Sequence, residues 1–368
     1  LCGDKAQLET LINSMTSHAQ NKLDKVLAYE SSLNAHLAFD ELSIAKGIGH
    51  KALALLGEPI SEKMNYFSRA KLIVKLAFLT MLLNIRDQKS QALMVDEEKR
   101  ASMRILNSLC QGAYFNGDEL LSEYILKMTE ISLKHGLSPE SAFSYPMFGA
   151  LLISYFGTIN AGYGFGELAL KNLNASNKEL HCKTITIVTN FINVWKQPYR
   201  NTREPLSNAY KIGMETGDIE CALIAAITSC TNAFIYANDL NRIFSSLEKH
   251  NQQARKLHQI PILNVGLIYQ QSIANLMGTS EKPWLFSGPY FNQNPLEKEL
   301  RDGKNTTNLY ILKLYLAVLF HQKDAALKYS KHIREGMLVA PSSPTFVFFI
   351  LYESLALISN FESASWIE

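Results

Sequence analysis

Five cysteines are the most reactive side chains in this sequence, and their spacing decides whether they can act together. They are Cys2, Cys110, Cys182, Cys221 and Cys230, an odd number with no CxxC pair among them. Cys221 and Cys230 are nine residues apart, so on a helix they point to opposite sides. We therefore expect neither a disulfide nor a cysteine pair that binds a metal ion. Small buried thiols in a reducing compartment are expected instead, which predicts a cytoplasmic protein.

Histidine is the other residue type that can bind a metal or move a proton. His181 stands beside Cys182, but neighbouring side chains on a helix point about 100° apart and do not converge on one ion. No HExxH pair occurs. The remaining histidines are scattered and are expected to be solvated or to cap helices: His18, His36, His50, His135, His250, His258, His321 and His332. The sequence therefore predicts no metal site.

Phosphate or nucleotide chemistry needs a glycine-rich loop that follows a strand. Gly162, Gly164 and Gly166 imitate such a loop, but the preceding residues do not form a strand pattern. No loop ends in Lys followed by Ser or Thr, so we expect no cofactor. Serine, cysteine or carboxylate catalysis by residues that only the fold brings together stays open as an alternative.

Composition narrows the function classes further. The formal net charge is +2 and 47% of the residues are hydrophobic, which indicates a folded protein without the basic field that holds nucleic acid, although a local patch is still compatible. Ser141 to Gly166 carries no charge and is long enough to span a membrane. Pro146 and five glycines interrupt this stretch, so it predicts two buried helices with a turn at Gly157 rather than membrane insertion.

Helical periodicity is the dominant pattern along the chain. Leu106, Leu109, Cys110, Ala113 and Tyr114 share one face, and a second helix places Leu121, Tyr124, Ile125, Met128 and Ile131 on one stripe. Such helical hairpins recur about every 40 residues. Their first helices are expected near Ala101, Ser141, His181, Ile219, Pro261, Thr306 and Pro344. This predicts an all-α fold, an α-solenoid of TPR-like helical hairpins with a period near 40 residues, with an irregular helical bundle as the alternative.

Three parts of the chain follow from this pattern. Residues 1–60 contain N-terminal helical hairpins that begin the array, 61–100 a helix and a charged connection, and 101–368 the repeat array. Gly136 is expected to cap one helix and Ser138 to begin the next, without the reciprocal bond of a capping box because position 141 is serine. Thr279 to Pro295 is an aromatic loop that is either packed down or used for contact.

A solenoid of this kind presents a concave groove lined by its first helices. Aromatic side chains on or near those helices suit a peptide, a protein partner or a small effector. The candidates for partner binding are Tyr114, Tyr145, Tyr155, Trp195, Tyr236 and Tyr269.

Several short stretches resemble the TPR-like helical region of hybrid sensor histidine kinases that carry an AAA-type ATPase module, a region related to maltose-activator-type ATPase regulators. They include Ala101-Ser-Met-Arg-Ile-Leu106, Leu133-Lys-His-Gly136, Ala161 to Ala169, Ala209-Tyr-Lys-Ile-Gly213 and Leu351 to Leu357. The resemblance covers about Asp96 to Ile358 and implies an ATP-binding module upstream and kinase domains downstream. The phosphate loop and phospho-accepting histidine of such proteins have no counterpart in this chain.

The resemblance implies a non-catalytic regulatory scaffold that binds a partner or effector and couples it to neighbouring ATPase and histidine-kinase domains. The sequence begins at Leu1 rather than Met, which we expect of a fragment of a longer protein. Two alternatives stay open: a freestanding TPR-type adaptor or effector protein, and an enzyme whose site is assembled only by the fold.

Overall fold

The computed structural model describes residues 5–39, 41–61, 92–116, 118–173, 178–236, 239–291, 305–336 and 341–360. Within these ranges the chain is helical and forms no strand, apart from an isolated bridge between Leu93 and Leu137. The chain divides into two compact units. Unit 1 comprises Leu1–Leu152 and Glu167–Asn172, and unit 2 comprises Ile153–Gly166 and Leu173–Glu368.

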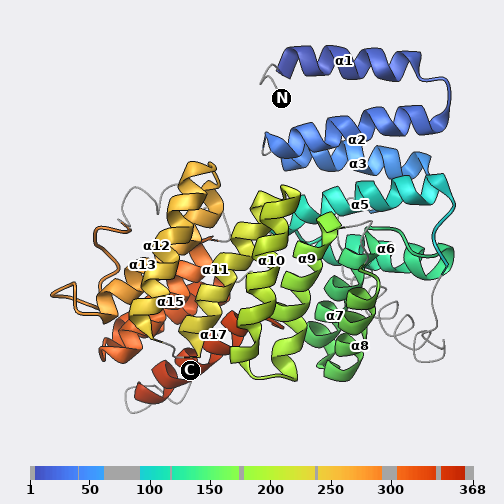
Figure 1. Ribbon diagram of the computed structural model, residues 1–368. Helices are drawn as coiled ribbons and strands as arrows, with labels where there is room; N and C mark the ends of the chain where they lie inside the picture. The colour runs from blue at the N-terminus through green and yellow to red at the C-terminus, as the bar shows by residue number, and fades with distance from the viewer. Residues whose placement is uncertain are drawn as a thin grey trace. The chain divides into compact units, whose positions relative to one another are not determined.

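Unit 1 is built from helices that pack against their neighbours in sequence, as Figure 1 shows. They are α1 (Lys5–His18), α2 (Lys22–Ala38), α3 (Leu42–Leu55), α5 (Glu97–Asn116) and α6 (Leu121–His135). The apolar faces expected for α5 and α6 are the buried faces, since Leu106, Cys110, Tyr124 and Met128 are all 0% exposed.

α7 (Ser141–Phe156) and α8 (Ile159–Lys171) contribute residues to both units. The turn between them is at Gly157, as predicted, with a positive φ of 63°. Pro146 lies inside α7 without ending it. None of the helices described in the chain has the length and apolar content needed to cross a membrane.

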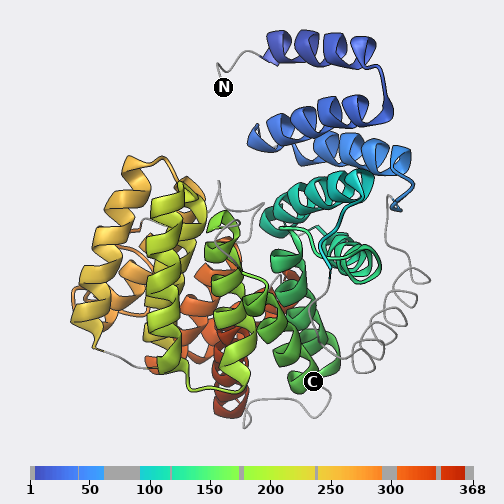
Figure 2. The same ribbon diagram turned by 45° about the vertical axis from the view of Figure 1, so that its right-hand side comes forward.

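Unit 2 continues the series of helices. They are α9 (Lys178–Ile187), a π-helical turn (Val188–Ile192), two short 3₁₀ turns (Asn193–Trp195 and Tyr199–Thr202), α10 (Arg203–Thr216), α11 (Ile219–Ile235), α12 (Leu240–Lys256), α13 (Ile260–Leu276), α15 (Asn305–Leu319), α16 (Lys323–Gly336) and α17 (Pro344–Ser359). Their order can be followed by colour in Figure 2. Consecutive helices such as α10 and α11, or α15 and α16, pack side by side.

The helices start close to the predicted positions. α7, α11 and α17 begin at Ser141, Ile219 and Pro344, and the largest difference is at α5, which begins at Glu97 rather than Ala101. The shortest interval between first helices runs from Ser141 to Lys178 and the longest from Ile260 to Asn305, that is, 37 and 45 residues. A regular solenoid with a period of 40 residues stays a prediction.

Helices three hairpins apart also meet in unit 2. The Phe234 ring of α11 lies 5.8 Å from Tyr269 of α13, 5.5 Å from Tyr315 of α15 and 6.1 Å from Phe348 of α17. In an ideal solenoid each repeat contacts only its neighbours. Unit 2 is therefore closed around an aromatic core that joins four of its first helices.

Two further predictions concern the helix ends. Gly136 caps α6 at a φ of 99°, and a Cβ there would lie 2.4 Å from the Ala92 carbonyl oxygen, so only glycine fits. The expected absence of a reciprocal bond at the start of α7 is wrong, because the Ser138 amide donates to the Ser141 hydroxyl at 3.0 Å. Serine is long enough to reach back when the chain forms a tight turn before the helix.

The three-part division at residues 60 and 100 also stays a prediction, and residues 62–91 of the second part lie outside the described ranges. α5 already begins at Glu97, inside the segment expected as a connection. Asp96 explains this start, because its carboxylate accepts hydrogen bonds from the amides of Glu98 and Lys99 at 2.9 and 3.2 Å.

Candidate functional site

The loop that follows α13 forms a cleft in unit 2. Its volume is about 400 Å³, and it is lined by Gln271, Thr279, Ser280, Glu281, Lys282, Ser287, Gly288 and Pro289. A volume of this size is within the range of small-molecule sites. We define this set of residues as the loop cleft.

Two buried amides of α13 hold the loop in place. Gln271 Oε1 accepts hydrogen bonds from the amides of Tyr290 and Phe291, both at 3.1 Å, and its Nε2 donates to Asn275 Oδ1 at 2.8 Å. Asn275 Nδ2 in turn donates to the carbonyls of Pro283 and Leu285 at 3.0 and 2.8 Å. These bonds tie the middle of the loop and its last described residues to α13.

Aromatic side chains complete the attachment of the loop. Phe286 and Phe291 are 2% and 1% exposed, and their rings meet edge to face at 5.5 Å. Tyr290 packs against Phe244 of α12 at 5.2 Å. Of the two interpretations that the sequence allowed, packing down accounts for Phe286 and Phe291.

The chemistry of the loop cleft is polar. Hydroxyl groups of Thr279, Ser280 and Ser287 stand near one carboxylate, Glu281, and one ammonium group, Lys282. Gly288 lies so close to Gln271 that a Cβ would come within 2.4 Å of Nε2, so the backbone approaches the buried amide directly. Such a lining suits a small polar ligand or a peptide segment through hydrogen bonds and paired charges.

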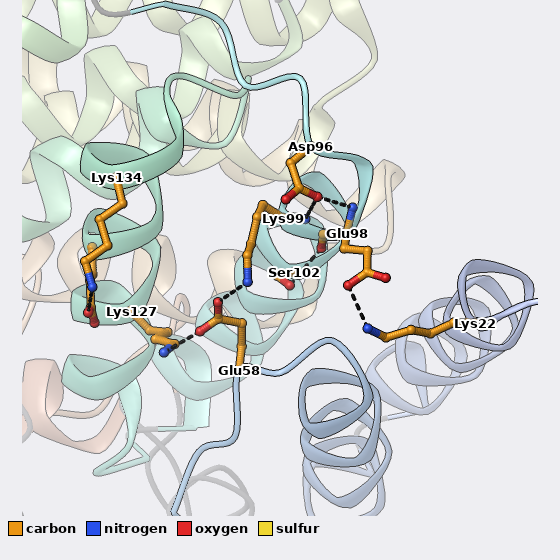
Figure 3. A network of polar contacts seen from close by, with 9 residues as sticks. Lys22, Glu58, Asp96, Glu98, Lys99, Ser102, Lys127 and Lys134 are labelled. Atoms are coloured by element: carbon orange, nitrogen blue, oxygen red, sulfur yellow. Dashed lines mark hydrogen bonds and ion pairs between the residues drawn. The ribbon is translucent and has the colours of Figure 1, made fainter.

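A second constellation, in unit 1, is charged. Glu58 follows the C-terminus of α3 and bridges two lysines, as Figure 3 shows: its Oε1 accepts from Lys99 of α5 at 2.5 Å and its Oε2 pairs with Lys127 of α6. A left-handed turn at Gly57, with a φ of 77°, directs the chain there, and the Glu58 amide donates to the Leu53 carbonyl at 2.9 Å.

Electrostatics keep the Glu58 carboxylate ionised. Burial alone would raise its pKa, but the hydrogen bonds and charges of Lys127 and Lys99 outweigh burial, so the pKa lies below the ordinary 4.5. Both carboxylate oxygens are engaged. This arrangement suits a cross-link between three helices better than proton transfer, because a general acid or base near neutral pH needs a raised pKa.

Other ion pairs join the same helices. Arg104 of α5 forms a two-point contact with Glu30 of α2 at 2.9 and 3.1 Å, and Lys46 of α3 pairs with Asp118 at 2.6 Å. The His50 ring of α3 lies 2.8 Å from the Tyr124 hydroxyl of α6. The helix junctions of unit 1 are therefore held by polar groups in addition to the apolar core.

The six aromatic residues predicted for partner binding are placed in different environments. Tyr145 and Tyr269 are buried, at 0% and 3% exposure, whereas Tyr155 and Tyr114 are 59% and 36% exposed. Tyr236 is half-buried, as is Trp195, whose indole nitrogen donates to the Ser342 carbonyl at 2.8 Å. Tyr269 belongs to the aromatic core around Phe234, so it does not line a groove.

Two of the cysteines in the described ranges, Cys182 and Cys221, contact each other in a small buried apolar cluster. Cys110, Cys182, Cys221 and Cys230 are buried free thiols, as expected from the sequence. Burial raises the pKa of the Cys230 thiol to about 12, which keeps it protonated. In the same ranges, no three His, Cys, Asp or Glu side chains converge as a metal-binding group.

The residues that organise both constellations are not among those predicted from the sequence. Gln271 and Asn275 stand four residues apart on a mostly apolar helix, and both are buried, as are Gln270 and Ser272. Glu58 follows a glycine at a helix end. Buried polar residues on an apolar face were the available signal, since such groups require partners.

Comparison with known proteins gives a weak sequence similarity to a signalling protein. No family model matches the chain. Over 184 residues the chain is 20% identical to hybrid signal transduction histidine kinase G of Dictyostelium discoideum. The matched part is 49% of this chain but only 5% of that kinase, so the chain spans a small fraction of its relative. The similarity indicates a link to signal transduction.

Proposed function

We propose that this chain is a non-catalytic helical scaffold of a larger, cytoplasmic signalling protein, which binds an effector or partner and couples it to ATPase and histidine-kinase domains. The observation that carries the proposal is the similarity of half the chain to a hybrid histidine kinase of which it covers 5%. Packed helix pairs agree with a scaffold role, because tandem helical hairpins commonly present binding surfaces.

We propose the loop cleft as the binding site of the effector. It lies on a loop whose backbone is fixed by Gln271 and Asn275, and rigid scaffolds that position a polar loop are typical of binding sites. A ligand in the loop cleft would contact α13 directly, because Gln271 of this helix lines the cleft. Because α13 packs against α11, α12 and α15, a change at the loop acts on several helices of unit 2.

The first test is the reading frame that encodes this chain. The proposal requires an ATPase module and a histidine-kinase domain in the same frame. A frame without them would overturn the coupling role and favour the freestanding adaptor.

The second test deletes the helical region in one variant and changes only the anchor of the loop cleft in another. Deleting Asp96–Ile358 from the intact protein is expected to abolish the response of autophosphorylation to its stimulus. Gln271→Ala should reduce that response, because the loop loses its anchor, while Gln252→Ala, at an exposed position of α12, should not. A normal response after the deletion would contradict the scaffold role, and equal responses of the two glutamine variants would contradict the role of the cleft.

A further inference from the structure

Two buried thiols of unit 2 meet although they are far apart in the sequence. Cys182 of α9 and Cys221 of α11 belong to one small apolar cluster, together with Leu206 and Ala209 of α10. Their exposed fractions are 0% and 4%, and both are free thiols. α9, α10 and α11 pack against one another, as Figure 1 shows. The fold therefore brings together two cysteines that the spacing in the sequence does not pair.

The two thiols interact directly. The pKa of Cys221 is raised, first because its thiol is hydrogen-bonded to Cys182 and then because it is buried. Cys230, on the same helix, belongs to a different apolar cluster, in which the described residues include no second cysteine. Burial accounts for the raised pKa of Cys230. Cys182 and Cys221 thus form a dithiol pair, and Cys230 offers a comparison with one buried thiol.

The backbone around the pair is closely packed. A Cβ at Gly213 of α10 would lie 3.0 Å from Cys182 Sγ and 3.0 Å from the Asp218 carbonyl oxygen, so α10 approaches both α9 and the start of α11. The Asp218 carboxylate accepts a hydrogen bond from the Cys221 amide at 3.3 Å and pairs with Lys183 at 3.6 Å. The residues beside each cysteine are therefore joined, which holds the two sulfur atoms together.

We propose that Cys182 and Cys221 are a modification site, which hydrogen peroxide converts into an intramolecular disulfide. One sulfur attacks a peroxide oxygen as its thiolate, the O–O bond breaks, and a sulfenic acid and a hydroxide form. The second sulfur attacks the sulfenic sulfur, the S–S bond forms, and the sulfenic oxygen leaves as a second hydroxide. The two thiol protons convert both hydroxides to water. The two thiols lose two electrons in total, and one peroxide molecule is reduced to two water molecules.

Contact selects this pair among the described cysteines. The two sulfurs of a disulfide are about 2.0 Å apart, so thiols that already touch are joined with the least movement of the helices. Burial keeps the thiols protonated and slows the attack, so the site responds to sustained rather than brief exposure to peroxide. In a reducing compartment the bond is transient, because thiol reductants reverse it. The bond joins α9 to the first turn of α11, and it does not depend on the proposed scaffold role.

Peptide mapping of the reduced full chain tests the proposal. The native chain is incubated with hydrogen peroxide, the remaining thiols are blocked with N-ethylmaleimide, and the digest is measured by mass spectrometry. The Cys182–Cys221 link should be at least about 10-fold more abundant than any other cysteine link, because disulfides form where sulfurs already meet. Dithiothreitol should remove it. A native chain without this link, or with other cysteine links at equal yield, would overturn the proposal.

Serine variants provide matched controls. Cys230→Ser removes a buried thiol, 6% exposed, from the same helix as Cys221 and should leave the yield of the link unchanged. Cys182→Ser and Cys221→Ser should each abolish the loss of two hydrogen masses from the intact chain. Far-ultraviolet circular dichroism checks that the helices of each variant are intact. An equal mass loss in Cys182→Ser contradicts the proposal, and the map of the unaltered chain decides if a variant does not fold.

Discussion

The two units hold their helices together in different ways. In unit 1, charged cross-links join different helices: Glu58 pairs with Lys99 and Lys127, Glu30 with Arg104, and Asp118 with Lys46. In unit 2, aromatic rings around Phe234 and buried amides such as Gln271 hold the helices and the loop. Buried apolar side chains also fill unit 1, and the Arg334–Glu353 ion pair also occurs in unit 2. We therefore expect a difference of degree, with the stability of unit 1 depending more on charge state and that of unit 2 more on packing.

The largest expected effect is the loss of the aromatic core. Phe234→Ala removes contacts to α13, α15 and α17 at once, and truncating a buried phenylalanine costs about 3–5 kcal/mol of stability. Hydrogen exchange followed by mass spectrometry should show lost protection in α11, α13, α15 and α17, the helices that Phe234 joins. As a control, Phe156→Ala, at a side chain 38% exposed, should change stability by less than about 1 kcal/mol. Loss confined to α11 would argue against a shared core.

Glu58→Gln is the destabilising substitution in unit 1 that corresponds to Phe234→Ala in unit 2. It leaves the ammonium groups of Lys99 and Lys127 facing each other without an anion, which we expect to cost about 2–4 kcal/mol. Glu97→Gln, on the helix that carries Lys99, is the control, because its side chain is 61% exposed and its pair with Arg100 contributes less than about 1 kcal/mol. Hydrogen exchange of α3, α5 and α6 measures both. Similar protection in the two variants would show that the Glu58 cross-link is dispensable.

As the pH is lowered, unit 1 should unfold at a higher pH than unit 2. Because the folded-state pKa of Glu58 is held below 4.5, its contribution is fully present above about pH 4.5 and falls as the pH drops through the lower folded value. Trp195, Trp284 and Trp366 all belong to the unit 2 part of the sequence. Circular dichroism is therefore expected to report helix loss at a higher pH than tryptophan fluorescence changes. If circular dichroism and tryptophan fluorescence change at the same pH, the two units do not respond to acid independently.

The smallest expected effect concerns helix ends. Unit 1 uses glycine at its left-handed turns at residues 57 and 136, whereas unit 2 uses glycine at residues 217 and 278 and also places His321 at a φ of 56° after α15. His321→Gly should stabilise unit 2 by up to about 1 kcal/mol, because glycine adopts this conformation without strain. Gly278→Ala, at a φ of 82°, should lose a similar amount. Thermal unfolding of both variants gives the sign of each change.

Much of the helical pattern could be read from the sequence. Helix starts at Ser141, Ile219 and Pro344, the Gly136 cap and the Gly157 turn follow from local rules, because periodicity and left-handed glycine turns involve only near neighbours. The candidate site could not be read in this way. Gln271 meets Tyr290 and Phe291 through a loop, and nothing local specifies that distance.

The sequence by itself determined that this chain forms consecutive helices with buried thiols and no membrane-length apolar helix among those described. Only the tertiary structure decided what the helix faces contact. It placed Tyr269 in a closed core rather than a groove, and it joined Glu58 to two lysines from other helices. The reason is physical: periodicity fixes which side chains share a face, whereas the partner of that face depends on contacts between residues far apart in the chain.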